Sequence, residues 1–368
     1  MSEDAIETID RLVSHVSTVP AIAGQKIDLF LREKIGAGVL DQSADTDFSG
    51  RVVLFVHGGY CPSTLAFDVP YRDYSWMEFL ARHGFDVFAM DMTGYGRSAR
   101  PLMNNPRNLD PAQQLLIVPD PLPQACAPDY PFALVNSDSE TADIARIVDY
   151  ICALRRVEKI CLIGWSGGGI RTGTFTRHHP GKVEKLILHA SSNYSRSNPD
   201  APPAVLPQPG APMTMQMRKA AIDERWLGTC TDPSTIEAGM PEIIWNLNIA
   251  HDPVGATWGS GGLRAPTRTY WGWNANAAAA ITTPTLLMTG EQDNLFAANL
   301  EIMEDLGASQ KAFVAIEAAT HFAVWEEQRR VLHRASLQWL TRTAVIPDAG
   351  ASGLGHFRAR RDGSIVRE

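Results

Sequence analysis

Cysteine is scarce in this sequence, and its spacing excludes two common structural uses. The 368 residues include five cysteines, and no two of them form a CxxC pair. Widely spaced cysteines in odd number indicate neither a zinc site nor a disulfide framework. We therefore expect no bound metal. The simplest interpretation of the cysteine content is that the protein is located in a reducing cytoplasm.

Positive charge and long apolar runs are also lacking. The formal net charge is −8 and no basic run stands out before the C-terminal segment, so nucleic acid is not expected as a partner. No stretch approaches the roughly 18 apolar residues of a membrane helix, so no membrane association is expected. The acidic residues 1–4 lack the basic and apolar regions of a signal peptide.

The composition that is present is typical of a folded protein. Hydrophobic residues make up 45% and charged residues 20% of the chain, which excludes a disordered or low-complexity protein. Length by itself indicates two or three domains.

Six short apolar runs recur along the chain, and segments of helical character separate them. The runs cover residues 52–56, 87–90, 160–163, 186–188, 286–288 and 313–316. Continuous apolar runs predict strands buried on both faces, as in a parallel sheet. Helices are predicted over residues 75–83, 137–155 and 326–343, and a capping-box pattern opens the second at Ser137. The alternation predicts an α/β fold with right-handed crossovers.

Two proline-rich segments interrupt this alternation. Residues 99–135 and 194–281 hold eighteen of the 24 prolines, a composition that disfavours central strands. We expect both to be insertions into one core. The second is long enough for helices of its own, near residues 213–227 and 241–249.

The strongest chemical signal is the sequence Gly164-Trp165-Ser166-Gly167-Gly168, between a predicted strand and a predicted helix over residues 170–179. This context is that of a nucleophile elbow, a strained turn with the serine at its tip. The glycines allow close backbone approach, and the helix N-terminus offers amide groups beside Ser166. We predict that Ser166 is a nucleophile; the alternative is a glycine-rich turn with an incidental serine.

A serine nucleophile requires a base and a carboxylate that orients the base. Of the ten histidines, His321 is our candidate, because it follows the last predicted strand on the edge where catalytic groups of parallel sheets gather. Asp293 follows the preceding strand and is the predicted acid, with Glu291 as the fallback. The alternative role for Asp293 is a helix N-cap.

An oxyanion requires hydrogen-bond donors, and His57-Gly58-Gly59-Tyr60 follows the first predicted strand. We expect one donor from the amide of Gly59 and one from the amide of Gly167. Tyr60 is expected to contribute through its amide or its hydroxyl, and His57 to hold the loop. The glycine-containing residues 91–98 are expected to form a structural turn rather than a phosphate loop.

In combination these motifs resemble the α/β-hydrolase fold. The matching parts are residues 57–59, 91–98 and 164–168, Asp293 and His321, in the family's order. The resemblance implies a mostly parallel eight-stranded sheet flanked by helices, a Ser-Asp-His triad, and a helical cap between the sixth and seventh strands. Serine at position 166 argues against the epoxide-hydrolase and haloalkane-dehalogenase branches, whose nucleophile is Asp. Two departures are Thr320, where many relatives have glycine, and the long segment 99–135.

The expected organisation is one catalytic domain with a large lid. Residues 1–193 and 282–343 form the core, 194–281 the cap, and 344–368 a C-terminal tail. In that tail, Asp362-Gly363 could form the turn of a small hairpin, but the sequence does not distinguish a hairpin from disorder. The sequence also leaves open whether the protein is a monomer or a homodimer.

Tryptophan is concentrated in the predicted cap, which holds five of the nine. We expect Trp165, Trp245, Trp271 and Trp273 to line an apolar substrate pocket. The alternative is that the cap tryptophans hold the cap onto the core or form the cap's own core.

Together these expectations describe a serine hydrolase that cleaves a carboxylic ester or lactone of a medium-sized apolar substrate, with no cofactor. The small-molecule ester or lactone is the only partner expected. A C–C bond hydrolase or an amidase on the same triad is the first alternative. A non-catalytic ligand-binding protein of this fold is the second.

Overall fold

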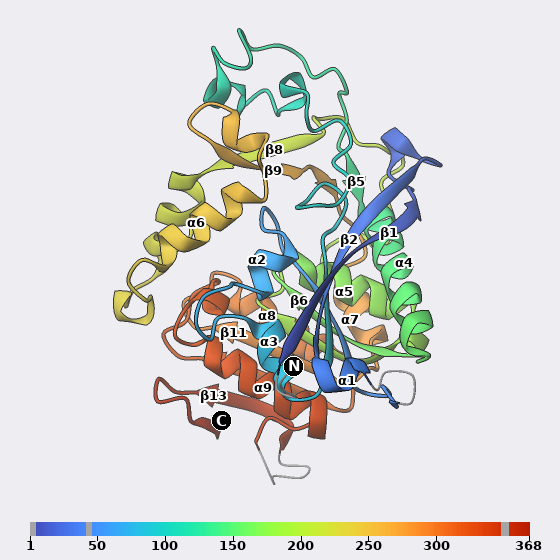
Figure 1. Ribbon diagram of the computed structural model, residues 1–368, viewed down its shortest axis with the longest axis vertical. Coiled ribbons are helices and arrows are strands. Elements are labelled where there is room, and N and C mark those ends of the chain that lie inside the picture. Colours follow the sequence, from blue (N-terminus) through green and yellow to red (C-terminus); the bar gives the residue numbers. More distant parts are fainter. Residues whose placement is uncertain (1–4, 42–45, 347–352) are drawn as a thin grey trace.

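The computed structural model describes residues 5–41, 46–346 and 353–368, and its centre is a ten-stranded sheet (Figure 1). The acidic residues 1–4 lie outside the described part. In spatial order the strands are β1 (Ile6–Val16), β2 (Lys26–Gly36), β4 (Asp86–Met90), β3 (Val52–Val56), β6 (Ile160–Trp165), β7 (Val183–His189), β11 (Thr285–Gly290), β12 (Lys311–Ile316), β13 (Gly355–Ala359) and β14 (Ile365–Arg367).

All six predicted apolar runs form neighbouring parallel strands, β4-β3-β6-β7-β11-β12. Every residue of β3, β4, β6 and β11 is buried. Helices cover both faces of such a sheet, so no position along these strands is exposed to solvent.

The two N-terminal strands were not identified by this pattern. β1 and β2 form an antiparallel hairpin with eleven paired positions, and β2 pairs antiparallel with β4. β1 is the edge strand, and its burial alternates along the chain. An edge strand with one solvated face carries alternating polar residues rather than a continuous apolar run.

Helices form a layer on each face of the sheet (Figure 1). α3 (Trp76–Arg82) and α9 (Arg329–Arg342) pack together on one face, beside the short α2 (Ser63–Phe67). The other face carries α4 (Ser137–Arg155), α5 (Gly167–His178), α7 (Ala275–Ala280) and α8 (Phe296–Asp305). A short α1 (Ala37–Asp41) follows β2.

The N-terminus of α4 differs by one residue from the predicted capping box. Asn136, not Ser137, is the N-cap: its side chain accepts a hydrogen bond from the Ser139 amide, and the Ser139 hydroxyl accepts one from the Asn136 amide. The Ser137 hydroxyl instead donates to the carbonyl oxygen of Trp271. Asparagine and serine both cap well, so the sequence pattern did not separate the two registers.

The segment expected to be a tail adds two strands to the sheet. β13 pairs parallel with β12, and β14 returns antiparallel to β13. The turn between them contains Asp362-Gly363, so the hairpin alternative is the one that forms. The sheet thus exceeds the eight strands implied by the resemblance because residues 353–368 bury Phe357 and Ala359 at its edge.

The long insertion, residues 194–281, is not purely helical. It contains β8 (Met213–Met217), a π-helical turn (Lys219–Glu224), α6 (Met240–Ala250), β9 (Gly262–Pro266), the short β10 (Arg268–Thr269) and α7. The expected helix over 241–249 is present as α6. The one expected over 213–227 is wrong in its first part, because Met213–Met217 pairs antiparallel with β9 as a strand.

The two proline-rich insertions pack against each other. A separate apolar cluster joins Met103, Leu109 and Ile117 of the first insertion to Met213 and Met215 of the second. A second contact pairs β10 in parallel with β5 (Val135–Asn136). Apart from α7, which packs on the sheet, both insertions lie together at one end of the molecule, beyond the sheet (Figure 1).

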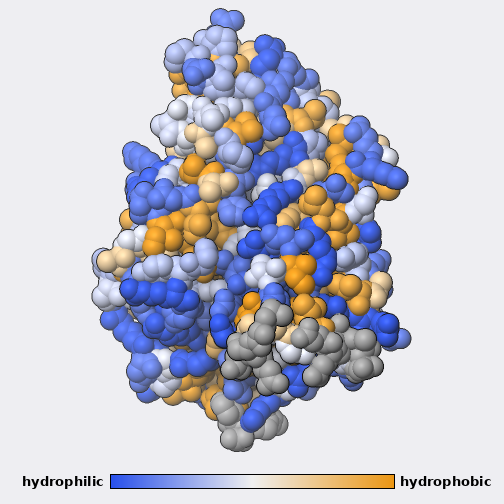
Figure 2. Space-filling model, viewed as in Figure 1, coloured by the Kyte–Doolittle hydropathy of each residue, from blue (hydrophilic) through white to orange (hydrophobic). Residues whose placement is uncertain are grey.

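On the face shown in Figure 2, hydrophobic residues occur in small groups among hydrophilic ones. Leu12 and Val16 of the edge strand β1 are among the exposed large hydrophobic residues. None of the described helices is long and apolar enough to cross a membrane.

Candidate active site

Ser166 occupies the sharp turn between β6 and α5. Its backbone has φ 54° and ψ −120°, a conformation that L-residues rarely adopt. The Ser166 amide donates to the carbonyl oxygen of His189 at 2.9 Å, which ties the turn to the end of β7. The predicted elbow is therefore present as a strained strand-to-helix turn.

Two glycines make this turn sterically feasible. A methyl group on Gly168 would lie 2.0 Å from the carbonyl oxygen of Val56, and one on Gly164 would lie 2.4 Å from the carbonyl oxygen of Gly168. Both contacts are with backbone, which cannot rotate away as a side chain does. The glycines before and after the serine are thus required by the approach of β3 and α5.

The predicted acid and base are hydrogen-bonded to each other. Nδ1 of His321 lies 2.9 Å from Oδ2 of Asp293, and the Asp293 side chain has no exposed area. Asp293 follows β11 and His321 follows β12, so adjacent parallel strands bring them together. A carboxylate at this position fixes the imidazole orientation and leaves Nε2 free to act as a base.

The sequence left two alternatives open: Asp293 as a helix N-cap, and Glu291 as the carboxylate beside the histidine. The hydrogen bonds of both residues decide between them. Leu295, not Asp293, is the N-cap of α8, and Asp293 Oδ1 accepts a hydrogen bond from the Leu295 amide at 2.9 Å. Glu291 pairs with Arg358 of β13, with 2.8 Å between Oε1 and Nε. Asp293 is therefore the carboxylate that contacts His321.

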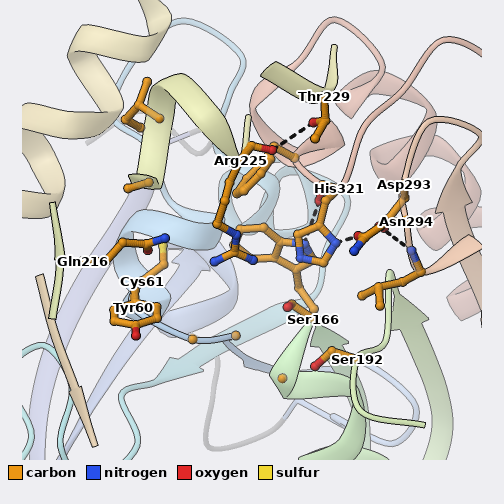
Figure 3. Close-up of a pocket in the computed structure, with 18 of the residues that line it drawn as sticks. Tyr60, Cys61, Ser166, Ser192, Gln216, Arg225, Thr229, Asp293, Asn294 and His321 are labelled. Atoms are coloured by element: carbon orange, nitrogen blue, oxygen red, sulfur yellow. Dashed lines mark hydrogen bonds and ion pairs between the residues drawn. The ribbon is translucent and has the colours of Figure 1, made fainter. Parts of the chain in front are cut away.

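Ser166, Asp293 and His321 line one cavity of about 530 Å³. Figure 3 shows Ser166 beside the imidazole of His321, with Asp293 on the far side of the ring. The three side chains thus follow one another in the order Ser166, His321, Asp293, which is the order expected of the predicted nucleophile, base and acid.

Trp165 lines this cavity, as predicted, and it also contacts His321. The indole Nε1 donates to the His321 carbonyl oxygen at 3.1 Å, and the two ring centroids are 5.7 Å apart. The residue before Ser166 therefore fixes the loop that carries His321.

The predicted oxyanion donors lie next to Ser166. Gly59 and Gly167 both line the cavity, and within the described part of the chain no group accepts a hydrogen bond from either amide. Tyr60 lines it too, but its hydroxyl is hydrogen-bonded to Oγ1 of Thr214 at 2.8 Å. Burial raises the pKa of the Tyr60 phenol.

His57 supports the oxyanion loop from inside the core. Its Nε2 accepts from the amide of Met92 at 3.1 Å, and Nδ1 lies 2.7 Å from the carbonyl oxygen of Gly58. Burial, with the nearby charge of Arg171, holds the pKa of His57 well below 6.5, so the ring is neutral. This is the structural role expected for it.

A buried ion pair also supports this loop. Nη1 of Arg171 donates to the carbonyl oxygens of His57 and Gly58, at 2.7 and 3.2 Å. Nε and Nη2 of the same guanidinium donate to Oε1 of Glu140, at 2.9 and 2.7 Å. α4 and α5 thereby hold the loop carbonyls away from the cavity.

Thr320, the departure from the family pattern, is part of the histidine loop. The Thr320 amide and hydroxyl both donate to the buried carboxylate of Glu326, which also accepts from Nε1 of Trp226 at 3.0 Å. Burial raises the pKa of Glu326. Threonine here links the histidine loop, through Glu326, to the long insertion.

The structure does not bring the other three predicted tryptophans to the cavity. Trp273 is fully buried against Gly173 and Tyr194, and Trp245 and Trp271 are buried outside the cavity lining. They pack the long insertion onto the core, which was the alternative given for them. A large aromatic side chain is favoured in both settings, so residue type could not distinguish them.

Several polar residues of the cavity were not identified from the sequence. They include Ser192, Gln216, Glu224, Arg225, Arg268, Gln292 and Asn294. They come from loops and from the long insertion, where no local motif marks them. Among the described residues, no group of three or more His, Cys, Asp or Glu side chains is placed to hold a metal ion.

Fold and site together define an alpha/beta hydrolase. The chain belongs to the alpha/beta hydrolase fold family, whose pattern matches residues 51–328.

Individual relatives agree with this family. The AB hydrolase superfamily protein YisY of Bacillus subtilis (strain 168) is 25% identical over 297 residues, which cover 77% of this chain and 89% of YisY. The crystal structure of the esterase RhEst1 from Rhodococcus sp. ECU1013 aligns with a TM-score of 0.55 at 15% identity, covering 90% of this chain and 99% of the esterase. A bromoperoxidase from Bacillus anthracis aligns with a TM-score of 0.53 at 13% identity and the same coverage. At these identities the two structures establish a shared fold.

Proposed function

We propose that this hydrolase is serine-dependent and cleaves a carboxylic ester or lactone through an acyl-enzyme. The observation that carries the proposal is the hydrogen bond between His321 and Asp293 in the cavity that also contains Ser166. A serine becomes an effective nucleophile when such an oriented base lies beside it.

In the proposed reaction, Ser166 attacks the carbonyl carbon while His321 accepts the hydroxyl proton. The amides of Gly59 and Gly167 stabilise the oxyanion, and His321 then returns the proton to the leaving alcohol. Water, activated by the same histidine, hydrolyses the acyl-enzyme. Asp293 stabilises the imidazolium in both half-reactions, and no cofactor takes part.

The long insertion is proposed to act as the cap that selects the substrate. It supplies Gln216, Ile222, Arg225 and Leu263 to the cavity, opposite the elbow. A cytoplasmic location is part of the proposal, supported by the five cysteines, which are all free.

The deciding experiment combines labelling with a substrate panel. A fluorophosphonate probe should label the wild-type protein and not Ser166→Ala, while Ser192→Ala, which removes a second hydroxyl from the same cavity, should still be labelled. Purified protein should then be assayed on esters, lactones and amides of graded length, with Ser166→Ala as the blank. Near-wild-type hydrolysis by Ser166→Ala would overturn the assignment.

The alternatives are separate outcomes of the same panel. If the protein cleaves amides or a diketone-like carbon–carbon bond, and Ser166→Ala loses that activity, the proposed triad is retained and the proposed substrate class is replaced. Absence of both labelling and turnover would favour a ligand-binding protein.

A further inference from the structure

Two guanidinium groups face the cavity that contains Ser166. Arg268, on β10, lines the cavity and stacks on the ring of Tyr270, with 4.7 Å from its guanidinium carbon to the ring centroid. Arg225, from the long insertion, lines it from another side. Neither group takes part in the chemistry proposed above.

Arg268 lies against both proposed oxyanion donors. A methyl group on Gly167 would be 3.1 Å from its Nη1, and one on Gly59 would be 3.8 Å from its Nη2. The stacking on Tyr270 holds the guanidinium plane in this place. A positive charge is therefore fixed within a few atoms of where the scissile carbonyl must lie.

The charge of Arg268 is balanced only in part within the described chain. Nη1 of Arg268 is buried and has no hydrogen-bond partner among the residues that the structure describes. The closest carboxylate oxygen is Oε1 of Glu140, 3.7 Å from Nη1. That oxygen already accepts two hydrogen bonds from Arg171, so one negative charge serves two buried guanidinium groups.

Arg225 adds a second cation without a carboxylate partner. Figure 3 shows its guanidinium reaching into the cavity between Gln216 and the side chains of Ser166 and His321. Its guanidinium lies 5.8 Å from the ring centroid of Phe322, and no ion pair to it is formed within the described ranges.

The acidic groups of the cavity are engaged elsewhere. Asp293 is hydrogen-bonded to His321, and the exposed Glu224 lies 3.6 Å from the ammonium of Lys219. Arg225 and Arg268 thus bring two positive charges to the cavity lining, and neither donates a hydrogen bond to a carboxylate of the described chain. Arg225 is exposed, but Arg268 is mostly buried. A buried guanidinium with an unpaired donor is costly, and its planar fork of donors matches a carboxylate.

We propose that the substrate carries a carboxylate a few atoms from the scissile carbonyl, and that Arg268, assisted by Arg225, binds it. This inference rests on the proposed function and names its substrate class: the half-ester of a short dicarboxylic acid, or a lactone bearing a carboxylate. It replaces the apolar substrate expected from the sequence, because three of the four tryptophans that motivated that expectation, Trp245, Trp271 and Trp273, do not line the cavity.

The test compares two substrates of equal size and different charge. Monoethyl glutarate carries the carboxylate, and its amide, ethyl 5-amino-5-oxopentanoate, replaces it with a neutral group of the same shape. Wild type should favour the acid by about tenfold or more in kcat/KM, as expected for a charge-assisted hydrogen bond. In Arg268→Gln this ratio should fall by about tenfold, and Arg268→Lys should retain part of it.

A control variant and the folding of every variant are measured in the same experiment. Arg218→Gln removes an exposed arginine of the same insertion, which pairs with Asp223 and does not line the cavity, and it should leave the ratio unchanged. Thermal melting of each variant reports whether it is folded. Arg225→Gln should lower the ratio less than Arg268→Gln.

Two results would overturn the inference. One is a wild-type ratio near one. The other is an equal loss on both substrates in Arg268→Gln, which would indicate a contact with the oxyanion instead of with a substrate carboxylate.

A binding measurement separates this inference from the proposed function. Glutarate binding, followed by calorimetry, should weaken by about tenfold or more in Arg268→Gln. If no ester is hydrolysed but glutarate binds through Arg268, the proposed function fails and the carboxylate site stands. If esters are hydrolysed but glutarate binding does not depend on Arg268, the proposed function stands and the carboxylate site fails.

Discussion

The indole nitrogen of Trp165 donates a hydrogen bond to the carbonyl oxygen of His321 across 156 positions of sequence. Trp165 is the last residue of β6 and directly precedes Ser166, whereas His321 follows β12. The side chain that directly precedes Ser166 therefore also positions the loop that carries His321. The distance between Ser166 and His321 depends on this contact as well as on the sheet.

Trp165→Phe should lower kcat while the protein remains folded. The substitution removes the hydrogen bond to His321 and keeps an aromatic ring in the buried site. A neutral hydrogen bond contributes about 1 kcal/mol, which corresponds to roughly a fivefold loss of rate. Steady-state kinetics on the ester that the wild type hydrolyses fastest measures this decrease in kcat.

Trp325→Phe is the matched comparison for that variant. Trp325 packs against Trp165, and its indole nitrogen has no partner among the described residues. The same ring truncation there should cost less in kcat than Trp165→Phe. Equal losses would show that ring volume, rather than the bond to His321, is what matters.

Asp293→Asn should lower kcat by about 10³- to 10⁴-fold, because the amide no longer stabilises the imidazolium and selects the wrong tautomer. Glu291→Gln tests the neighbouring carboxylate, which pairs with Arg358, and should leave kcat within about twofold. Kinetics of the two variants on one substrate decides between them. A large loss in Glu291→Gln with little in Asp293→Asn would exchange their roles.

Gly168→Ala should destabilise the fold by about 1–3 kcal/mol or prevent folding, because the added methyl group would lie 2.0 Å from the carbonyl oxygen of Val56. Gly181→Ala is the control, since a methyl group there meets no atom within 4 Å. Urea unfolding of both variants gives the comparison. A Gly168→Ala protein as stable as wild type would contradict the steric account of the elbow.

The free energy of unfolding should decrease as the pH falls from about 6.5 toward 4. Burial lowers the pKa of His189 from 6.5 to about 4 and that of His333 to about 3. At these two positions the unfolded chain therefore binds more protons than the folded protein below pH 6.5, so their contribution to stability is lost as the pH falls. Urea unfolding at pH 7, 6 and 5 should show a loss of about 1–2 kcal/mol per histidine between pH 7 and 5.

The variant His333→Gln measures how much one histidine contributes to the decrease in the free energy of unfolding at low pH. This variant removes a proton-binding site of the unfolded chain, so its stability should fall less steeply with acidification than that of wild type. The difference between the two slopes is the measured quantity. Identical slopes would mean that His333 is protonated equally in the folded and unfolded states.

The sequence predicted the centre of the fold because its signals there are local. Each parallel strand is a short apolar run, and the glycines around Ser166 are adjacent to it in sequence. The hairpin of β1 and β2 was missed because an edge strand alternates apolar and polar residues. Residues 213–217 were expected in a helix and form a strand, because pairing with β9 determines their conformation.

The cavity was less predictable than the three candidate catalytic residues. Trp245, Trp271 and Trp273 had the residue type of a binding pocket, yet they pack the long insertion onto the core. Arg225 and Arg268 carried no local pattern at all. Their position in the cavity becomes visible only when the long insertion folds over the elbow. Arg225 then has no ion pair in the described chain, and Arg268 shares Glu140 with Arg171.

The sequence by itself determined the order of the strands along the chain and the places of Ser166, Asp293 and His321 at strand ends, since steric and hydrophobic patterns over a few residues encode them. Only the tertiary structure decided that Asp293 and not Glu291 contacts the histidine, that Trp165 holds the histidine loop, and that two arginines face the cavity. These contacts join side chains distant in sequence, and no local pattern specifies which distant groups the packed core brings within hydrogen-bonding distance.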